Sequence, residues 1–312
     1  MSPSSTQPTP DLPPDLPEPS QPSLRLRDRD YGPGHLLVMA ILNRTPDSFY
    51  AGARQLADAE ADEAVARAVE EGADILDVGG VKAGPGDEVD EAEEIRRVLP
   101  FVERVRDRHP DLLISVDTWR SGVAKRVCAA GADLVNDTWA GHDPALVDVA
   151  AEYGVGMVCS HTGGAVPRTR PHRVSYGTTP EGVVDDVLDT LRTAAARAVA
   201  AGVHPRSVLL DPTHDFGKNT WHGLALLRAT GRLVELGHPV LMALSRKDFV
   251  GETLDLDVDE RLEGTLAATA VAAWLGAQVF RAHDVRATRR VLDMVASIRG
   301  ERPPARAVRG LA

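Results

Sequence analysis

Short continuous apolar runs alternate along the chain with alanine-rich stretches that carry charged residues. A continuous apolar run is typical of a parallel strand buried on both faces, and the stretch that follows is typical of a covering helix. The runs are LLVMAIL ending at Asn43, DILDV at 74–78, LLISV before Asp117, DLV before Asn136, GMVCS before His161, SVLL before Asp211, VLMALS at 240–245 and QVF before Arg281. About eight strand–helix units close a parallel barrel, so the pattern predicts one α/β domain, a (β/α)8 TIM barrel.

A short internal repeat supports this interpretation. Gly-Ala-Asp occurs at 72–74 and 131–133, and Gly-Ala-Gln at 276–278, each directly before a predicted strand. The glycine is expected to end the preceding helix in a left-handed cap, after which the strand begins at once. A doubly wound open sheet is the alternative fold, but no G-x-G-x-x-G loop follows the first strand.

The ends of the chain differ from its body. Residues 1–34 hold 9 of the 22 prolines and little apolar material, which predicts a disordered N-terminal tail. The barrel is expected over residues 35–300, and residues 301–312 are expected to form a second tail. The length of the middle segment fits one eightfold barrel.

Composition narrows the functional classes. The net charge of −11 argues against a nucleic-acid or anionic-membrane binder, which needs a basic face. Two cysteines are too few for a disulfide framework and fit a reducing compartment. No run of about 18 apolar residues and no secretion signal occurs, so we expect a cytoplasmic protein without a membrane-spanning segment.

Polar or charged residues end nearly every predicted strand. In a TIM barrel the carboxyl ends of all strands lie on one face, where the active site is built. Carboxylates on this face can bridge the N–H edge of an amino-heterocycle, and cations beside them can hold an anion. The predicted ligand is a heterocycle with an anionic group. The residues are Asn43, Asp77, Asp117, Asn136, His161, Asp211, Lys247, Arg281 and His283.

All of these residues except His161 lie in motifs that resemble the dihydropteroate synthase family. The motifs span almost the whole predicted barrel in the family's order. They are MAILNRTPDSF, DILDVGG, LISVDTWR, GADLVNDT, LLDP with FGK at 209–218, ALSRK, RLEGTLAATA and FRAHDV. The resemblance implies a TIM barrel, a homodimer, and a reaction in which p-aminobenzoate displaces diphosphate from 6-hydroxymethyl-7,8-dihydropterin diphosphate with Mg²⁺.

The resemblance also implies roles for single residues. Asp117, Asn136, Asp211 and Lys247 match the residues that hold the pterin edge, and Asp77 matches a pocket aspartate of the family. Asn43 matches the asparagine that helps to bind the metal and the diphosphate. Arg281 and His283 match the pair that stacks on the ring and grips the diphosphate. Lys247, Arg281 and His283 are therefore the expected catalytic residues.

Two departures affect the mobile loops of the family. After DVGG the family typically reads E-S-T-R-P-G, whereas residues 81–86 here read Val-Lys-Ala-Gly-Pro-Gly. The serine, threonine and arginine that close over diphosphate and p-aminobenzoate are therefore missing. Arg44 stands where valine is usual, and Lys82 is also new. These two cations could rebuild an anion site or serve a different ligand.

A third departure affects the p-aminobenzoate subsite. The family's S-R-K-S is Ser-Arg-Lys-Asp at 245–248, and the lost serine opens the helix whose N-terminus receives the aminobenzoate carboxylate. We expect the carboxylate of Asp248 to occupy those N–H groups, so that aminobenzoate binds poorly. The alternative is that Asp248 is a cap that points to solvent.

Two further segments differ from the family. Its glycine–phenylalanine–glycine is Thr-His-Asp at 213–215, and its Met-His-Met is Ser-His-Thr at 160–162. The loop at 165–176 carries arginines and could receive an anion or a protein partner, with a solvated loop as the alternative. A metal centre of His161, Asp211, His214 and Asp215 is disfavoured, because the first strand lacks the paired histidines of barrel metallohydrolases.

Three hypotheses on function remain open. The first is a divergent paralogue of dihydropteroate synthase, resembling the second, possibly inactive copy of actinomycetes. It would keep the pterin and diphosphate pocket but have weak or absent synthase activity. The second is a working synthase in which Arg44 and Lys82 replace the missing loop cation. The third is a non-catalytic regulatory or partner subunit that acts through the basic loop and the tails.

Overall fold

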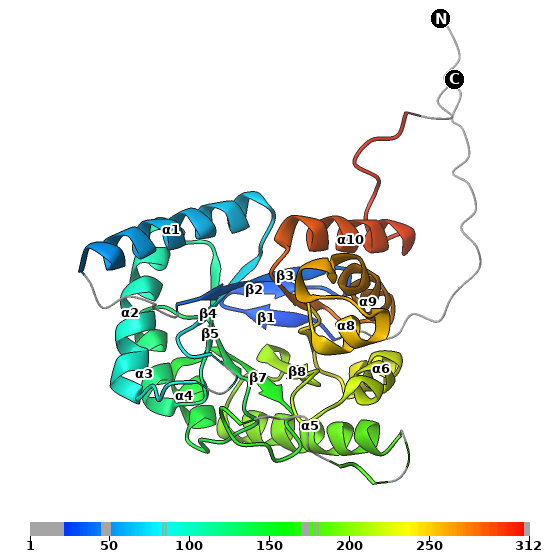
Figure 1. Cartoon of the computed structure of the whole chain (residues 1–312), viewed down its shortest axis with the longest axis horizontal. Helices are drawn as coiled ribbons and strands as arrows, with labels where there is room; N and C mark the ends of the chain where they lie inside the picture. Colours follow the sequence, from blue (N-terminus) through cyan, green and yellow to red (C-terminus); the bar gives the residue numbers. More distant parts are fainter. Residues whose placement is uncertain are drawn as a thin grey trace, which may run out of the picture.

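A parallel barrel forms the body of the protein, with helices around it (Figure 1). The computed structural model describes residues 22–44, 51–82, 84, 86–169, 175–177, 179 and 181–308, of which only the backbone is described for 51–57. The barrel strands are β3 (Leu37–Asn43), β4 (Ile75–Gly79), β5 (Leu113–Asp117), β6 (Leu134–Asp137), β7 (Gly156–Ser160), β8 (Val208–Asp211), β9 (Leu241–Met242) and β10 (Val279–Ala282).

Strand pairing closes the barrel. Strands β3 to β8 pair with their neighbours in chain order, and β10 pairs with both β3 and β9. A parallel bridge between Leu210 and Val240 then joins β8 to the segment that enters β9. All eight strands are parallel, which confirms the predicted TIM barrel and excludes the open sheet. The predicted run at 240–245 pairs only over Leu241–Met242.

The helices cover the outside of the barrel. They are α1 (Ala51–Glu70), α2 (Glu91–Arg108), α3 (Ser121–Ala129), α4 (Leu146–Tyr153), α5 (Gly182–Ala201), α6 (Thr220–Arg228), α7 (Thr230–Val234), α8 (Asp248–Leu254), α9 (Leu262–Trp274) and α10 (Val285–Ile298). Alternate residues of each strand face the two sides: Val38 and Ala40 pack under the helices, and Met39 lies in the barrel centre. No helix among the described residues is long and apolar enough to cross a membrane.

The Gly-Ala-Asp repeat ties neighbouring strands together. Gly72, Gly131 and Gly276 have φ of 95°, 97° and 104°, which confirms the predicted left-handed caps. The carboxylate of Asp133 then accepts the backbone N–H of Ile114 at 2.8 Å and a guanidinium N–H of Arg106 at 2.6 Å. Asp74 accepts the N–H of Val38 in the same way, at 2.8 Å. Asp74 and Asp133 therefore each fix the start of one strand against its neighbour.

Residues 24–31 correct the predicted boundary of the N-terminal tail. They form an antiparallel hairpin of β1 (Leu24–Leu26) and β2 (Arg29–Tyr31), so the prediction that residues 1–34 are disordered was wrong for this segment. Leu24 and Leu26 are 0% and 1% exposed, because they pack on the inner residues at the amino ends of the strands. The hairpin therefore closes the barrel at that end. Residues 1–21 lie outside the described residues.

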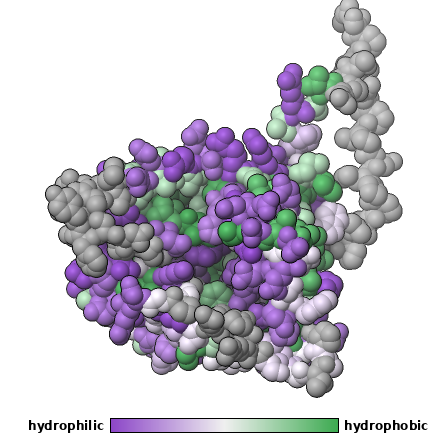
Figure 2. Space-filling view, in the orientation of Figure 1, coloured by the Kyte–Doolittle hydropathy of each residue, from purple (hydrophilic) through white to green (hydrophobic). Residues whose placement is uncertain are grey.

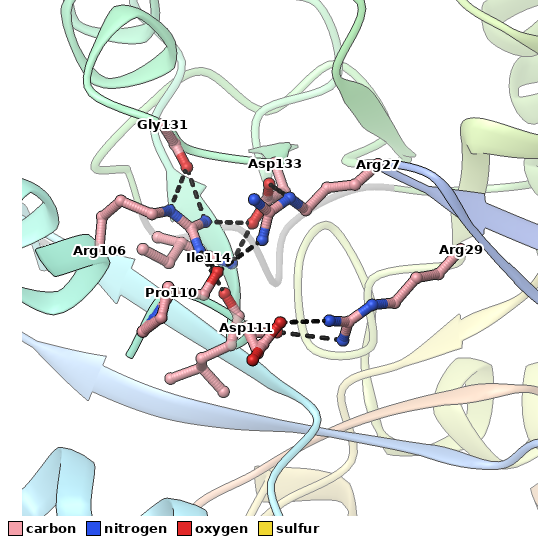
Figure 3. Close-up of polar contacts among 9 residues, drawn as sticks. Arg27, Arg29, Arg106, Pro110, Asp111, Ile114, Gly131 and Asp133 are labelled. Atoms are coloured by element: carbon pink, nitrogen blue, oxygen red, sulfur yellow. Dashed lines mark hydrogen bonds and ion pairs between the residues drawn. The ribbon is translucent and has the colours of Figure 1, made fainter. Parts of the chain in front are cut away.

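Ion pairs hold the hairpin in place (Figure 3). The guanidinium of Arg27 lies 3.2 Å from the carboxylate of Asp133 and donates to the carbonyl of Pro110 at 2.8 Å. Arg29 donates to Asp111 at 2.7 Å. Because Asp133 also binds Arg106, the hairpin is linked to the entry of β6 and to α2.

We expect Leu26→Ala to lower the free energy of unfolding by about 2–3 kcal/mol, because it removes a fully buried side chain and leaves a cavity. Urea denaturation of the variant measures this effect. Arg25→Ala in the same strand is the matched control, since Arg25 lies between the two buried leucines and is only half-buried. Equal stability of the two variants would show that the hairpin does not seal the core.

Candidate functional site

The carboxyl ends of the strands gather most of the predicted site residues. The mouth of the barrel, at the carboxyl ends of its strands, contains Asp77 from β4, Asp117 from β5, Asn136 from β6, Asp211 from β8 and Arg281 from β10. Of these, Asp77, Asn136 and Asp211 are 0%, 2% and 4% exposed. Figure 2, from the viewpoint of Figure 1, shows hydrophilic side chains over much of the visible surface and around the hollow near its middle.

Arg281 and two carboxylates form the centre of this cluster. The Nε of Arg281 donates to Asp77 Oδ2 at 2.6 Å, and its Nη2 donates to Asp117 Oδ2 at 3.1 Å. Ser115 donates to Asp77 Oδ1 at 2.6 Å, and Asn136 Nδ2 lies 3.3 Å from Asp77 Oδ2. The Arg281 guanidinium therefore already occupies one oxygen of each of these two carboxylates. A heterocycle with an N–H edge would have to compete with Arg281 for Asp117.

Burial sets the electrostatics of the mouth. Burial raises the pKa of Asp117 to about 7, and the nearby charge of Arg281 opposes this rise. Burial also raises the pKa of Asp211, against the lowering effects of the Thr213 backbone N–H and Lys247. The pKa of the Lys247 ammonium is lowered by burial. Two acids and an ammonium of this kind can bind an uncharged heterocycle by donating hydrogen bonds to its edge or accepting them from it.

Lys247 points into the mouth from the turn before α8. Its Nζ donates to the carbonyl of His214 at 2.8 Å and lies 4.8 Å from the centre of the Phe216 ring. Asp211 accepts the backbone N–H of Thr213 at 2.7 Å. Lys247 and Asp211 therefore both contact the 213–216 loop that follows β8.

Asn43 and His283 lie at the exposed edge of the mouth, apart from the buried cluster. Asn43 is the last residue of β3. Its Oδ1 lies beside Gly79, where a Cβ atom on residue 79 would be only 3.1 Å from this oxygen. His283 follows β10, and its Nδ1 lies 3.0 Å from Ser245 Oγ. Their exposed positions suit contacts with a group that extends out of the barrel.

Arg44 does not face the mouth. Its guanidinium pairs with Asp58 of α1 and lies 5.0 Å from the centre of the Phe101 ring in α2. The hypothesis that Arg44 and Lys82 together rebuild an anion site is therefore not supported for Arg44. Lys82 is exposed in the loop after β4, and its neighbours 83 and 85 lie outside the described residues.

The structure corrects the expectation for Asp248. Its carboxylate is 76% exposed and pairs with Arg261 at 2.9 Å, so it does not occupy the start of α8. Instead, the backbone N–H of Asp248 donates to the carboxylate of Asp215 at 2.7 Å. The structure therefore matches the alternative, in which Asp248 points to solvent, and the carboxylate at the helix start is that of Asp215 from the 213–216 loop.

Lys218 is a buried residue of the site that the sequence analysis did not single out. It is 2% exposed, and its Nζ donates to the carbonyls of His161, Thr213 and Phe216 at 2.8, 3.1 and 2.7 Å. Burial lowers its pKa to about 7. The phenylalanine–glycine–lysine motif at 216–218 was its only sequence signal.

The disfavoured metal centre does not form among the described residues. His161 Nε2 pairs with Asp186 at 2.6 Å, and His214 is fully buried with its ring centre 5.4 Å from that of Phe249. No group of three His, Cys, Asp or Glu residues converges on one point in the described ranges. In the basic loop at 165–176, Arg168 donates to the carbonyl of Asp87, and residues 170–174 lie outside the description.

The comparison with protein families identifies the class of this barrel. The model of the pterin binding enzyme family matches residues 39–283, which include every residue of the mouth described above. The chain therefore belongs to the pterin-binding enzyme family. This confirms the resemblance on which the site residues were assigned.

Individual relatives divide into two groups. The chain is 67% identical to inactive dihydropteroate synthase 2 of Mycobacterium tuberculosis over 276 residues, which cover 88% of this chain and 87% of the relative. It is 39% identical to dihydropteroate synthase of Bacillus subtilis over 264 residues, covering 83% and 87%. Dihydropteroate synthase from Thermus thermophilus, solved with 4-aminobenzoate, is 37% identical, with a TM-score of 0.75 over 88% of this chain and 99% of that one.

Proposed function

We propose that the protein binds a pterin with a diphosphate group in the barrel mouth and has weak or absent dihydropteroate synthase activity. The observation that carries this proposal is the buried set of hydrogen-bonding groups in the mouth. Asp117, Asn136 and Asp211 come from three neighbouring parts of the barrel mouth; Asn136 and Asp211 are 2% and 4% exposed, and Asp117 is 21% exposed beside Arg281. Such a set suits the donor edge of a pterin.

Two observations support the loss of synthase activity. The loop at 81–86 lacks the serine, threonine and arginine that the synthase motif carries. A relative that is 67% identical is named inactive, whereas four relatives named as synthases without that word are 34–39% identical. Arg44, the other candidate to replace the loop cation, is engaged with Asp58.

Magnesium fits this proposal only together with the ligand. Asn43 offers one amide oxygen at the exposed edge, and Mg²⁺ prefers six oxygens, many of them from water and phosphate. We propose that Asn43 supplies one oxygen to a Mg²⁺ ion that arrives with the diphosphate, and that Arg281 and His283 assist in holding that group. The ion would neutralise the diphosphate charge.

We propose a homodimer formed through α9 and α10 in the cytoplasm. These helices pack side by side (Figure 1) and carry exposed apolar residues. Val271 and Trp274 of α9 are 47% and 48% exposed, and Met294 and Ile298 of α10 are 61% and 60% exposed. Both cysteines are free and buried, which suits a reducing compartment. A partner protein at the basic loop is the alternative assembly.

The pterin proposal predicts a loss of affinity on changing Asp211. We expect Asp211→Ala to weaken the binding of 6-hydroxymethyl-7,8-dihydropterin diphosphate by about 2–3 kcal/mol, the cost of removing a charged hydrogen-bond acceptor. Calorimetric titration with the pterin diphosphate in the presence of Mg²⁺ measures this loss of affinity. Asp211→Asn keeps the size of the side chain and guards against misfolding, and Asp248→Asn is the control on the same face. Unchanged affinity in both Asp211 variants would contradict the proposed pocket.

A further inference from the structure

Both oxygens of the Asp77 carboxylate have partners from the barrel itself. Oδ1 accepts the hydroxyl of Ser115 at 2.6 Å, and Oδ2 accepts the Nε–H of Arg281 at 2.6 Å. The amide nitrogen of Asn136 lies 3.4 and 3.3 Å from these two oxygens. Asp77 and Ser115 are both 0% exposed. A ligand that enters the mouth therefore cannot contact Asp77 without breaking these hydrogen bonds.

Asp117 holds the other end of the same guanidinium less closely. Nη2 of Arg281 donates to Asp117 Oδ2 at 3.1 Å, and Asp117 Oδ1 accepts the hydroxyl of Thr138 at 2.8 Å. The side chain of Asp117 is 21% exposed, whereas that of Asp77 is fully buried. A ligand that comes from solvent can therefore reach Asp117, and Arg281 is the group that it has to displace from Oδ2.

The register of the strands explains why the two carboxylates differ. Asp77 of β4 is level with Ser115 of β5, whereas Asp117 of β5 is level with Gly79 of β4. Because a strand rises about 3.3 Å per residue, Asp77 lies roughly 7 Å deeper in the barrel than Asp117. The Arg281 guanidinium spans both levels, with Nε on the deep carboxylate and Nη2 on the carboxylate nearer solvent.

Asp77 also orients the amide of Asn136. The side-chain amide of asparagine donates through its nitrogen and accepts through its oxygen. Because the nitrogen of Asn136 donates to Asp77, the oxygen is the atom left to accept a hydrogen bond from a ligand. Asp77 therefore sets the direction of two neighbouring side chains from below the mouth.

We infer that Asp77 is a positioning residue, which anchors Arg281 through Nε so that the guanidinium stays in the mouth when a pterin displaces it from Asp117. This role rests on the proposed function, because it concerns how the proposed pocket receives its ligand. Once Nη2 has left Asp117, it is available to the diphosphate that Arg281 is proposed to hold. Without the anchor, the guanidinium keeps only Asp117 of the two carboxylates and competes with the pterin for it.

The test compares two ligands that differ only in the diphosphate. The wild type and Asp77→Asn are titrated calorimetrically, in the presence of Mg²⁺, with 6-hydroxymethyl-7,8-dihydropterin diphosphate and with 6-hydroxymethyl-7,8-dihydropterin. We expect Asp77→Asn to weaken binding of the diphosphate at least about tenfold, the effect of losing one hydrogen bond to a charged group. Binding of the ligand without diphosphate should weaken by no more than about threefold. A general loosening of the pocket would weaken both ligands by the same factor.

Further variants show whether Asp77 acts through Arg281. In an Arg281→Met background, Asp77→Asn should cause no further selective loss, because the Nε contact is already gone. Ser115→Ala removes one support of Asp77 and keeps its charge, so we expect a selective loss of about threefold.

Ser207→Ala is the matched control for Ser115→Ala and should leave both affinities unchanged. Ser207 is also buried and donates at 2.6 Å, but to the carbonyl of Arg25 at the amino end of the barrel.

The outcomes separate this role from the proposed function. A selective loss for the diphosphate in Asp77→Asn, or in Ser115→Ala if Asp77→Asn does not fold, supports the role. Equal losses for both ligands, no loss, or a further selective loss in the Arg281→Met background overturn it and leave the pterin proposal standing. A wild type that does not bind the pterin diphosphate overturns the proposed function, and the role of Asp77 falls with it.

Discussion

Replacing Lys218 by methionine is expected to lower the free energy of unfolding by about 3–5 kcal/mol. Methionine has a similar length but no donor, so the carbonyls of His161, Thr213 and Phe216 would lose a buried partner. Each unsatisfied buried carbonyl costs about 1–3 kcal/mol. The variant no longer has to bury an ammonium, and this gain offsets part of the total cost of the three carbonyls.

The loss should appear in urea denaturation and should extend to the site. Because Lys218 links the loop after β7 to the loop after β8, we expect the variant to bind pterin weakly as well. Lys125→Met is the matched control, since Lys125 is 57% exposed and lies 3.6 Å from Glu152 on the surface. A stability loss below about 1 kcal/mol, as for a surface pair, would show that Lys218 does not hold these loops.

Acid is expected to destabilise the protein through two buried histidines. Burial lowers the pKa of His161 to about 4 and that of His214 to about 3, from the ordinary 6.5. The unfolded chain takes up protons on these imidazoles as the pH falls below about 6.5, whereas the folded chain does not. Their contribution to stability is complete above 6.5 and declines by about 1.4 kcal/mol per pH unit for each group as the pH falls.

Buried acids act in the opposite direction, so the measurement has to be a difference between variants. Burial raises the pKa of Asp117 to about 7 and that of Asp137 to about 6, and these groups favour the folded state as the pH falls through that range. We therefore compare urea denaturation of the wild type and His214→Phe at pH 7 and pH 4.5.

The His214→Phe variant should lose about 2–3 kcal/mol less than the wild type between these pH values. Phenylalanine suits the site, because the His214 ring is fully buried next to Phe249. His142→Phe is the control, since His142 is exposed and its substitution should leave the acid sensitivity unchanged. Equal acid sensitivity of wild type and His214→Phe would show that His214 is not a buried neutral imidazole.

The barrel could be predicted from the sequence because both faces of its strands are buried. Strands such as β5 and β8 are buried over their apolar residues on both faces, so their sequences show nearly unbroken apolar runs that end in Asp at the mouth. The hairpin was missed because its segment follows a proline-rich stretch and contributes only Leu24 and Leu26 to the core. The alternation Leu-Arg-Leu-Arg at 24–27 was the signal, since it has the period of a strand.

Side-chain directions at the site could not be predicted in the same way. The sequence indicated that a carboxylate would fill the start of α8, but it suggested Asp248, which lies there along the chain. The structure uses Asp215, because a left-handed backbone in the loop after β8 brings its side chain to that helix from 33 residues away. Likewise, the motif placed Arg281 in the mouth but did not show that it pairs with Asp77 and Asp117.

The measurement that tests the account most directly is one titration followed by one assay on the same sample. The protein is titrated calorimetrically with 6-hydroxymethyl-7,8-dihydropterin diphosphate and Mg²⁺, and 4-aminobenzoate is then added while dihydropteroate is quantified by chromatography. The account predicts saturable pterin binding with little or no dihydropteroate formed. Rapid formation of dihydropteroate, or failure to bind the pterin at all, would contradict it.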